Sequence, residues 1–287
     1  MPELPQVAAL RDFLAGHLVG RVIARVELAS VAVLKTYDPP LSALLGCEIG
    51  LVQRFGKWLD VDAQGVHLVF HLARGGWLAW HDQLPTRPLR AAKGPICLRV
   101  GLDGPEGFDL TEAGTQRNLA VHVVRDPREV PAIASLGLDP LGAGFTPAML
   151  DRILAGAGRA QIKGLLCDQR MIAGIGNAYS DEILYAAKLS PFKPASSLDA
   201  PQRARLFDAI RQVLGQATEG AMGLGPAELK DNKRARLRVH GRTGQICEVC
   251  GSRIADVNFA DSVLQYCPGC QTDGKVLADR RMSRLLK

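Results

Sequence analysis

The sequence predicts an α+β multidomain protein: a β-sandwich with one N-terminal helix, a helical domain, and a small cysteine-rich C-terminal unit. Three observations support this class. Short runs of Val, Ile, Leu and Trp, punctuated by Gly, Pro and Asp, fill the first part of the chain. Helical spacing follows them, and four cysteines gather near the C-terminus. A length of 287 residues fits about two domains with an appendage.

The first predicted domain covers residues 1–132 and begins with a helix. Apolar residues at helical spacing define that helix: Val7, Leu10, Phe13, Leu14 and Leu18. Seven predicted strands then form an antiparallel sandwich or barrel: residues 21–29, 47–55, 57–63, 66–73, 76–82, 96–102 and 119–124.

A Pro- and Gly-rich linker over residues 126–145 leads into the second predicted domain, residues 133–224, which is helical. Thr146 is the expected N-cap of its first helix and Pro147 the first helical residue. Further helical patterns cover residues 160–171, 177–189 and 200–222. Residues 225–287 form the third predicted domain.

The composition indicates a chain of the cytoplasm, associated with the nucleoid if the source is bacterial. No run of about 18 apolar residues appears, and charged residues near the start argue against a signal peptide. The net charge is +6, and residues 225–287 carry 12 Lys and Arg against 7 Asp and Glu. This basic segment is either a solvated face or a surface for a polyanionic partner.

Four of the seven cysteines have the spacing C-x₂-C-x₁₆-C-x₂-C, which is typical of a zinc ribbon over residues 247–270. Cys247, Cys250, Cys267 and Cys270 are therefore predicted to bind one structural Zn²⁺ through four thiolates, with iron as the lesser alternative. The remaining cysteines are expected to be small core residues: Cys47, Cys97 and Cys167.

The stretch GIGNAYSDEIL in the helical domain is a candidate anion site. Gly174 and Gly176 permit a tight turn, and Asn177 is placed to cap the next helix, whose first N–H groups are unpaired. Lys163 lies upstream and is expected to reach the same anion. The alternative is a plain glycine turn between packed helices.

The chain begins with MPELPQV. If Met1 is removed, Pro2 becomes a secondary amine that is partly neutral near pH 7 and able to attack an aldehyde carbon. The alternative is that this heptapeptide has no chemical role.

Together these motifs resemble the formamidopyrimidine-DNA glycosylase/endonuclease VIII family. The resemblance spans nearly the whole chain and rests on PELP at 2–5, FGKW at 55–58, residues 162–184, RVHGRTGQIC at 238–247 and the terminal zinc ribbon. It implies a base-excision repair enzyme that flips an oxidised base out of duplex DNA. It also implies a helix–two-turns–helix domain and a terminal zinc finger.

The resemblance carries over to individual residues. Pro2 matches the nucleophile that attacks C1′ and leads to strand cleavage by β-elimination. Glu3 matches the acid that protonates the sugar ring oxygen, and Lys57 matches a lysine that contacts phosphate beside the lesion. Lys163 and Asn177 match phosphate contacts of the helix–two-turns–helix domain.

Several positions depart from the family pattern. Gln6 replaces a glutamate, and Ser262 stands where the finger usually carries an arginine. Arg74 replaces the void-filling methionine, and Arg117 is the best substitute in an altered second wedge loop; both are expected to contact DNA. His71 is interpreted as structural.

Two main hypotheses follow. The first is a bifunctional DNA glycosylase/AP lyase, with activity reduced by Gln6 and Ser262. The second is a catalytically weak or silent paralogue that binds damaged DNA. A zinc-ribbon protein of transcription or translation would leave the N-terminus and the glycine turn unexplained. The expected partner is double-stranded DNA that contains damaged bases or abasic sites. The protein is expected to act as a monomer and not to bind a membrane. The sequence does not indicate which lesion is preferred.

Overall fold

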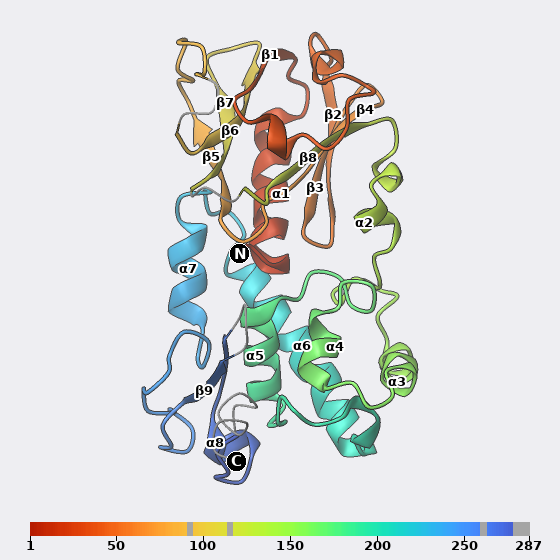
Figure 1. Cartoon of the computed structure of the whole chain (residues 1–287), viewed down its shortest axis with the longest axis vertical. Coiled ribbons are helices and arrows are strands. Elements are labelled where there is room, and N and C mark those ends of the chain that lie inside the picture. Colours follow the sequence, from red (N-terminus) through yellow and green to blue (C-terminus); the bar gives the residue numbers. More distant parts are fainter. Residues whose placement is uncertain (91–93, 114–116, 259–262, 278–287) are drawn as a thin grey trace. The chain divides into compact units, whose positions relative to one another are not determined.

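The computed structural model describes residues 1–90, 94–113, 117–258 and 263–277. The chain divides into two compact units (Figure 1). Unit 1 comprises Met1–Leu136 and Thr218–Asn232, and unit 2 comprises Gly137–Ala217 and Lys233–Lys287. The predicted division into three domains is not tested by this division into two units.

Unit 1 is built from two four-stranded antiparallel sheets. The first sheet has the order β1 (Ile23–Leu28), β6 (Ile96–Leu102), β7 (Gly107–Glu112) and β5 (Gly76–His81). The second has the order β2 (Ile49–Phe55), β3 (Trp58–Ala63), β4 (Val66–His71) and β8 (Ala120–Val124). All seven predicted strands are present, and β7 is an eighth that the sequence analysis missed.

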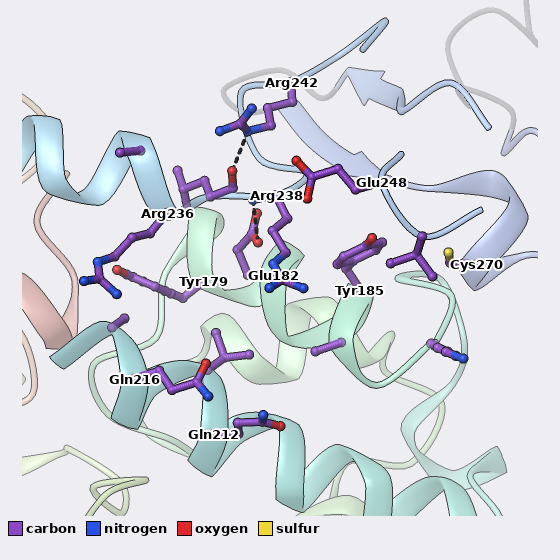
Figure 2. A pocket seen from close by; sticks show the side chains of 17 residues that line it. Tyr179, Glu182, Tyr185, Gln212, Gln216, Arg236, Arg238, Arg242, Glu248 and Cys270 are labelled. Carbon is purple, nitrogen blue, oxygen red and sulfur yellow. Dashed lines mark hydrogen bonds between the residues drawn. The ribbon is translucent and has the colours of Figure 1, made fainter. Parts of the chain in front are cut away.

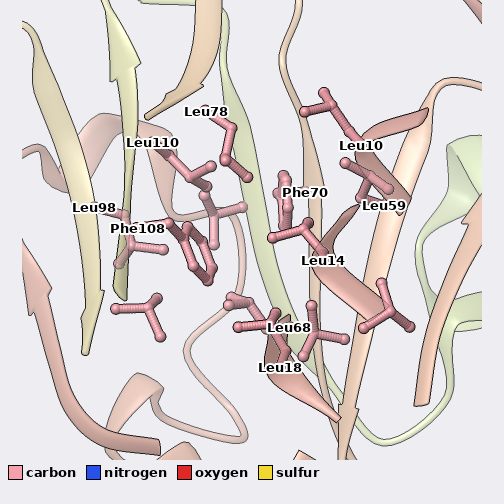
Figure 3. Close-up of a cluster of buried hydrophobic side chains, with 14 of the residues drawn as sticks. Leu10, Leu14, Leu18, Leu59, Leu68, Phe70, Leu78, Leu98, Phe108 and Leu110 are labelled. Carbon is pink, nitrogen blue, oxygen red and sulfur yellow. The ribbon is translucent and has the colours of Figure 1, made fainter. Parts of the chain in front are cut away.

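Helix α1 (Leu4–Leu18) supplies the apolar stripe that the sequence predicts. Leu10, Leu14 and Leu18 are fully buried in one cluster with residues of both sheets (Figure 3). Within that cluster Phe70 of β4 and Phe108 of β7 lie with their ring centroids 6.2 Å apart. The helix therefore belongs to the core of unit 1 rather than to its surface.

Short helical segments lie between β1 and β2 and after β8. They are the 3₁₀ turns η1 (Val31–Val33), η2 (Leu41–Leu44) and η3 (Pro127–Glu129), and the one-turn helix α2 (Pro131–Ala134). Helix α7 (Leu229–Arg236) begins in the second segment of unit 1, and Leu229 is buried in the same cluster as α1.

Unit 2 contains helices packed around their own core. They are α3 (Pro147–Gly156), α4 (Ile162–Cys167), α5 (Asn177–Ala186), the 3₁₀ turn η4 (Ala195–Ser197) and α6 (Ala200–Glu219, of which the residues to Ala217 belong here). Thr146 caps α3 as predicted, because its hydroxyl accepts the N–H of Met149.

The cysteine-rich end of unit 2 forms a small finger. It contains the antiparallel hairpin of β9 (Ala255–Asn258) and β10 (Val263–Tyr266), followed by the one-turn helix α8 (Pro268–Gln271). The predicted fold class is confirmed: a β-sandwich with one helix, a helical domain and a finger. In the described part of the chain, every helix is too short or too polar to cross a membrane.

Candidate active site and metal centre

Residues 2–10, which lead into and begin α1, are buried, whereas Met1 is exposed. Pro2 is buried, and Glu3, the N-cap of the helix, is only 2% exposed. Glu3 and Gln6 form a reciprocal capping box, in which the Gln6 side-chain oxygen accepts the Glu3 backbone N–H at 3.2 Å. Gln6 thus fixes the backbone beside Pro2 through an amide that does not titrate.

Lys57 occupies the turn between β2 and β3 and is 8% exposed. Burial, aided by the ammonium group of Lys57, lowers the pKa of His71 to about 4. The neutral ring of His71 accepts the Ala73 N–H at Nδ1 (3.1 Å) and lies against Trp58, with ring centroids 4.9 Å apart. These contacts agree with the structural interpretation of His71.

Arg74 and Arg117 lie in two separate loops of unit 1, and Glu112 anchors the second of them. Arg74 is exposed, and Arg117 donates to the Gly94 carbonyl at 2.7 Å. The buried Glu112 carboxylate accepts the N–H groups of Asn118 (2.7 Å) and Leu119 (2.8 Å).

The first of these loops packs against the second. A Cβ added to Gly76 would lie 3.0 Å from the Leu119 side chain and 2.3 Å from the Leu72 carbonyl. Only glycine fits there, because any other residue would place its Cβ against the Leu72 carbonyl. Sequence reasoning missed Glu112 together with β7, the strand that ends at this residue.

The glycine turn before α5 differs in detail from the prediction. Gly174 has φ of +97°, as a tight turn requires, but Gly176 is the N-cap and Asn177 is the first helical residue. The expectation that Asn177 caps the helix is therefore wrong by one position. Its side-chain amide instead donates to the Val263 carbonyl of β10 at 2.8 Å.

Lys163 is held inside unit 2. Its ammonium group lies 2.6 Å from Asp181 Oδ1 and 2.8 Å from Ser180 Oγ, and it contacts the Asn177 carbonyl at 3.2 Å. The side chain is 12% exposed. Lys163 therefore positions the first turn of α5. Its predicted contact with a phosphate would have to form while its ammonium group stays bound to Asp181.

Two adjacent carboxylates of α5 bind the segment before the finger and the finger itself, and sequence reasoning missed both. Asp181 accepts His240 Nδ1 at 2.7 Å and the Gln265 N–H at 3.1 Å. Glu182 accepts the backbone N–H groups of residues 238, 239 and 240 at 2.8 to 2.9 Å. The only sequence signal was two adjacent acidic residues within the helix.

The four predicted zinc ligands come together in unit 2. The Sγ atoms of Cys247, Cys250, Cys267 and Cys270 all lie within 4.8 Å of one another. Four thiolates at about 2.3 Å from Zn²⁺ would lie about 3.8 Å apart, so the cluster fits a closed structural site. The finger thus holds one structural zinc. Ser262, the departure noted in the finger, lies outside the described residues.

The other three cysteines take no part in this cluster. Cys97 is buried, while Cys47 and Cys167 are half-buried. The sequence expectation of small core residues is met fully only at Cys97.

Comparisons with known proteins agree with this arrangement. Three family models match: the formamidopyrimidine-DNA glycosylase N-terminal domain (residues 1–117), the formamidopyrimidine-DNA glycosylase H2TH domain (136–226), and the zinc finger found in FPG and IleRS (244–272). The class is therefore that of DNA glycosylases with a helix–two-turns–helix domain and a terminal zinc finger. The chain belongs to the formamidopyrimidine-DNA glycosylase family.

Some relatives match about half of the chain, and others match nearly all of it. An uncharacterized formamidopyrimidine-DNA glycosylase-like protein of Mycobacterium tuberculosis is 52% identical over 157 residues, which are 55% of this chain and 98% of that protein. The crystal structure of the MutM (FPG) protein from Thermus thermophilus is 31% identical with a TM-score of 0.78, covering 94% of this chain and 98% of that one.

A second solved structure shares the fold. It is Lactococcus lactis formamidopyrimidine-DNA glycosylase bound non-covalently to DNA containing an AP site, at 24% identity and a TM-score of 0.80. The match covers 94% of this chain and 99% of that one.

Proposed function

We propose that this chain is a bifunctional DNA glycosylase and AP lyase of base-excision repair, acting on double-stranded DNA with oxidised bases or abasic sites. The observation that carries the proposal is the buried Pro2–Glu3 pair at the start of α1, held by Gln6. Membership of the family and the Lactococcus relative bound to AP-site DNA support the choice of substrate.

In the proposed reaction, Met1 is removed and the Pro2 nitrogen attacks C1′ of the damaged nucleotide. The glycosidic bond breaks, and the base leaves with its electron pair and takes up a proton. Glu3 protonates the sugar ring oxygen as the ring opens, which leaves an iminium between Pro2 and C1′. Loss of a C2′ proton then expels the 3′ phosphate by β-elimination.

Lys57, Lys163 and Asn177 are proposed to contact DNA phosphates, and Arg74 and Arg117 to contact DNA at the lesion. Because His71 is neutral, the ammonium group of Lys57 is the charged group of this pair. The zinc finger is proposed to supply a further DNA-binding surface whose geometry depends on the metal.

Borohydride trapping on abasic-site duplex tests the chemistry. Protein shown by intact mass to lack Met1 is expected to form a covalent adduct, and acetylation of its N-terminus is expected to abolish it. The matched control is protein from the same preparation that retains Met1, in which the Pro2 nitrogen is an amide. Equal trapping by both forms would overturn the role of Pro2.

Binding without trapping by the processed protein would instead support the silent paralogue. Gln6 is the observation that favours this alternative, because its amide cannot move a proton. Under the proposal, Gln6→Glu keeps the capping box and raises the single-turnover rate of base excision. Ser262→Arg is expected to steepen the salt dependence of DNA binding by close to one unit of log–log slope.

A further inference from the structure

Unit 2 contains a cavity of about 570 Å³ that the proposed reaction does not use (Figure 2). Its walls come mainly from the second half of α5, from α6, from residues 235–242 and from residues 248–249 of the finger. Four α5 residues line it: Tyr179 in the first turn, and Glu182, Tyr185 and Ala186 in the last five residues. Neither Asn177 nor the glycines before it are among the lining residues.

The lining carries an excess of positive charge. Lys188, Arg236, Arg238 and Arg242 contribute four cations, and Glu248 is the one exposed acid among the lining residues. In the described part of the chain, the Arg236 and Arg238 guanidinium groups have no hydrogen-bond or ion-pair partner. Figure 2 shows the Arg238 guanidinium between Glu182 and Tyr185.

Within the described residues, the buried acid in the wall forms no ion pair with Arg236 or Arg238. Glu182 is 6% exposed, and its carboxylate is already engaged by three backbone N–H groups. The unpaired guanidinium groups thus remain available to an anion, and an Arg fork matches phosphate oxygens in pairs.

The remainder of the lining suits an organic group next to that anion. Gln212 and Gln216 of α6 offer side-chain amides, and Figure 2 shows both along the wall opposite Arg238. Val213 and Val249 supply apolar surface, and Val249 is 60% exposed. Apolar surface with a few polar groups is the usual lining of a small-molecule site.

We propose that this cavity binds a nucleotide, with its phosphates on Arg236 and Arg238 and its base against Val213, Val249 and the two glutamines. The nucleotide is either a free nucleoside diphosphate or triphosphate, or one unit of a nucleic acid strand. This inference goes beyond the proposed glycosylase and lyase reaction and does not depend on it.

Calorimetric titration of the zinc-loaded full chain with ADP at low salt tests the proposal. ADP is expected to bind, and Arg236→Gln with Arg238→Gln is expected to weaken it at least tenfold. The matched control is Arg159→Gln, an exposed arginine of the same unit outside the cavity, which is expected to leave the affinity unchanged. Zinc content verifies that each variant folds.

Two further titrations test the base and the source of the phosphate. Pyrophosphate is expected to bind more weakly than ADP, and Gln212→Ala with Gln216→Ala to weaken ADP but not pyrophosphate. Displacement of ADP by undamaged duplex would assign the site to nucleic acid, and its absence would assign it to a free nucleotide. The proposal is overturned if ADP does not bind, if the arginine variants bind it normally, or if pyrophosphate binds equally well.

Discussion

The Glu182 carboxylate is expected to hold residues 238–240 in place, and Glu182→Ala tests this directly. The variant removes the acceptor of three backbone hydrogen bonds at 2.8 to 2.9 Å, one of them from the buried Val239. Hydrogen bonds to charged groups contribute about 1.5–3 kcal/mol each, but the cost of burying the carboxylate offsets part of this sum. We expect a local loss of about 3 kcal/mol.

Hydrogen exchange of the zinc-loaded protein measures this loss at the amides concerned. At about 1.4 kcal/mol per tenfold change, exchange at residues 238–240 should accelerate roughly a hundredfold. Asp208→Asn, an exposed acid on α6 of the same unit, is the control and should leave these amides protected.

Glu182→Gln keeps the prediction testable if the alanine variant does not fold. Glu182 Oε1 accepts both Val239 and His240, whereas Oε2 accepts Arg238. A glutamine oxygen in the Oε1 place retains two bonds and turns its amide group toward the third donor. Faster exchange at Arg238 alone is expected. Unchanged exchange in both variants would refute the view that Glu182 orders this segment.

Three other outcomes are expected. Burial raises the pKa of Asp60 from 3.8 to about 6. Between these two pH values the folded state binds a proton that the unfolded state has lost, so the free energy of unfolding falls as the pH rises. Asp60→Asn should remove up to about 3 kcal/mol of that fall, as measured by urea titrations at pH 4 to 7. Ala73 has φ of +50°, so Ala73→Gly should raise stability by about 0.5–1 kcal/mol, whereas Ala63→Gly in β3 should lower it. A chelator should release one zinc per chain, as measured with a metallochromic dye. Zinc removal should also accelerate hydrogen exchange in residues 244–272 but not in β2–β4. Equal acceleration in both regions would contradict a local structural zinc.

The strands were predictable wherever apolar residues alternate, and β7 shows where that signal ends. Its sequence GFDLTE places charged residues at buried positions. Asp109 is 2% exposed because Arg99 of β6 pairs with both of its oxygens at 2.8 Å. Glu112 is equally buried because loop N–H groups satisfy it. A composition-based prediction reads such residues as loop, since their partners lie elsewhere in the sequence.

The zinc ligands were predictable because their spacing alone defines the site. The position of Lys163 was not predictable, because the sequence does not show whether its ammonium group faces a phosphate or binds Asp181. The acidic pair of α5 was likewise invisible, since its partners at residues 238–240 and 265 are more than 50 positions away.

One face of α5 accounts for the placement of the finger within unit 2. Asn177, Asp181 and Tyr185 are spaced four residues apart, so they share that face. Their partners run along the finger: the Val263 carbonyl, the Gln265 N–H and Cys247 Sγ, which lies 3.2 Å from the Tyr185 hydroxyl.

The same helix thus presents the glycine turn at its first residue and contacts a zinc ligand two turns later. A ligand that shifts the start of α5 would act on the finger through these three side chains, and loss of zinc would act in the reverse direction. The finger is therefore positioned by three side chains of α5 as well as by the cysteines of the zinc site.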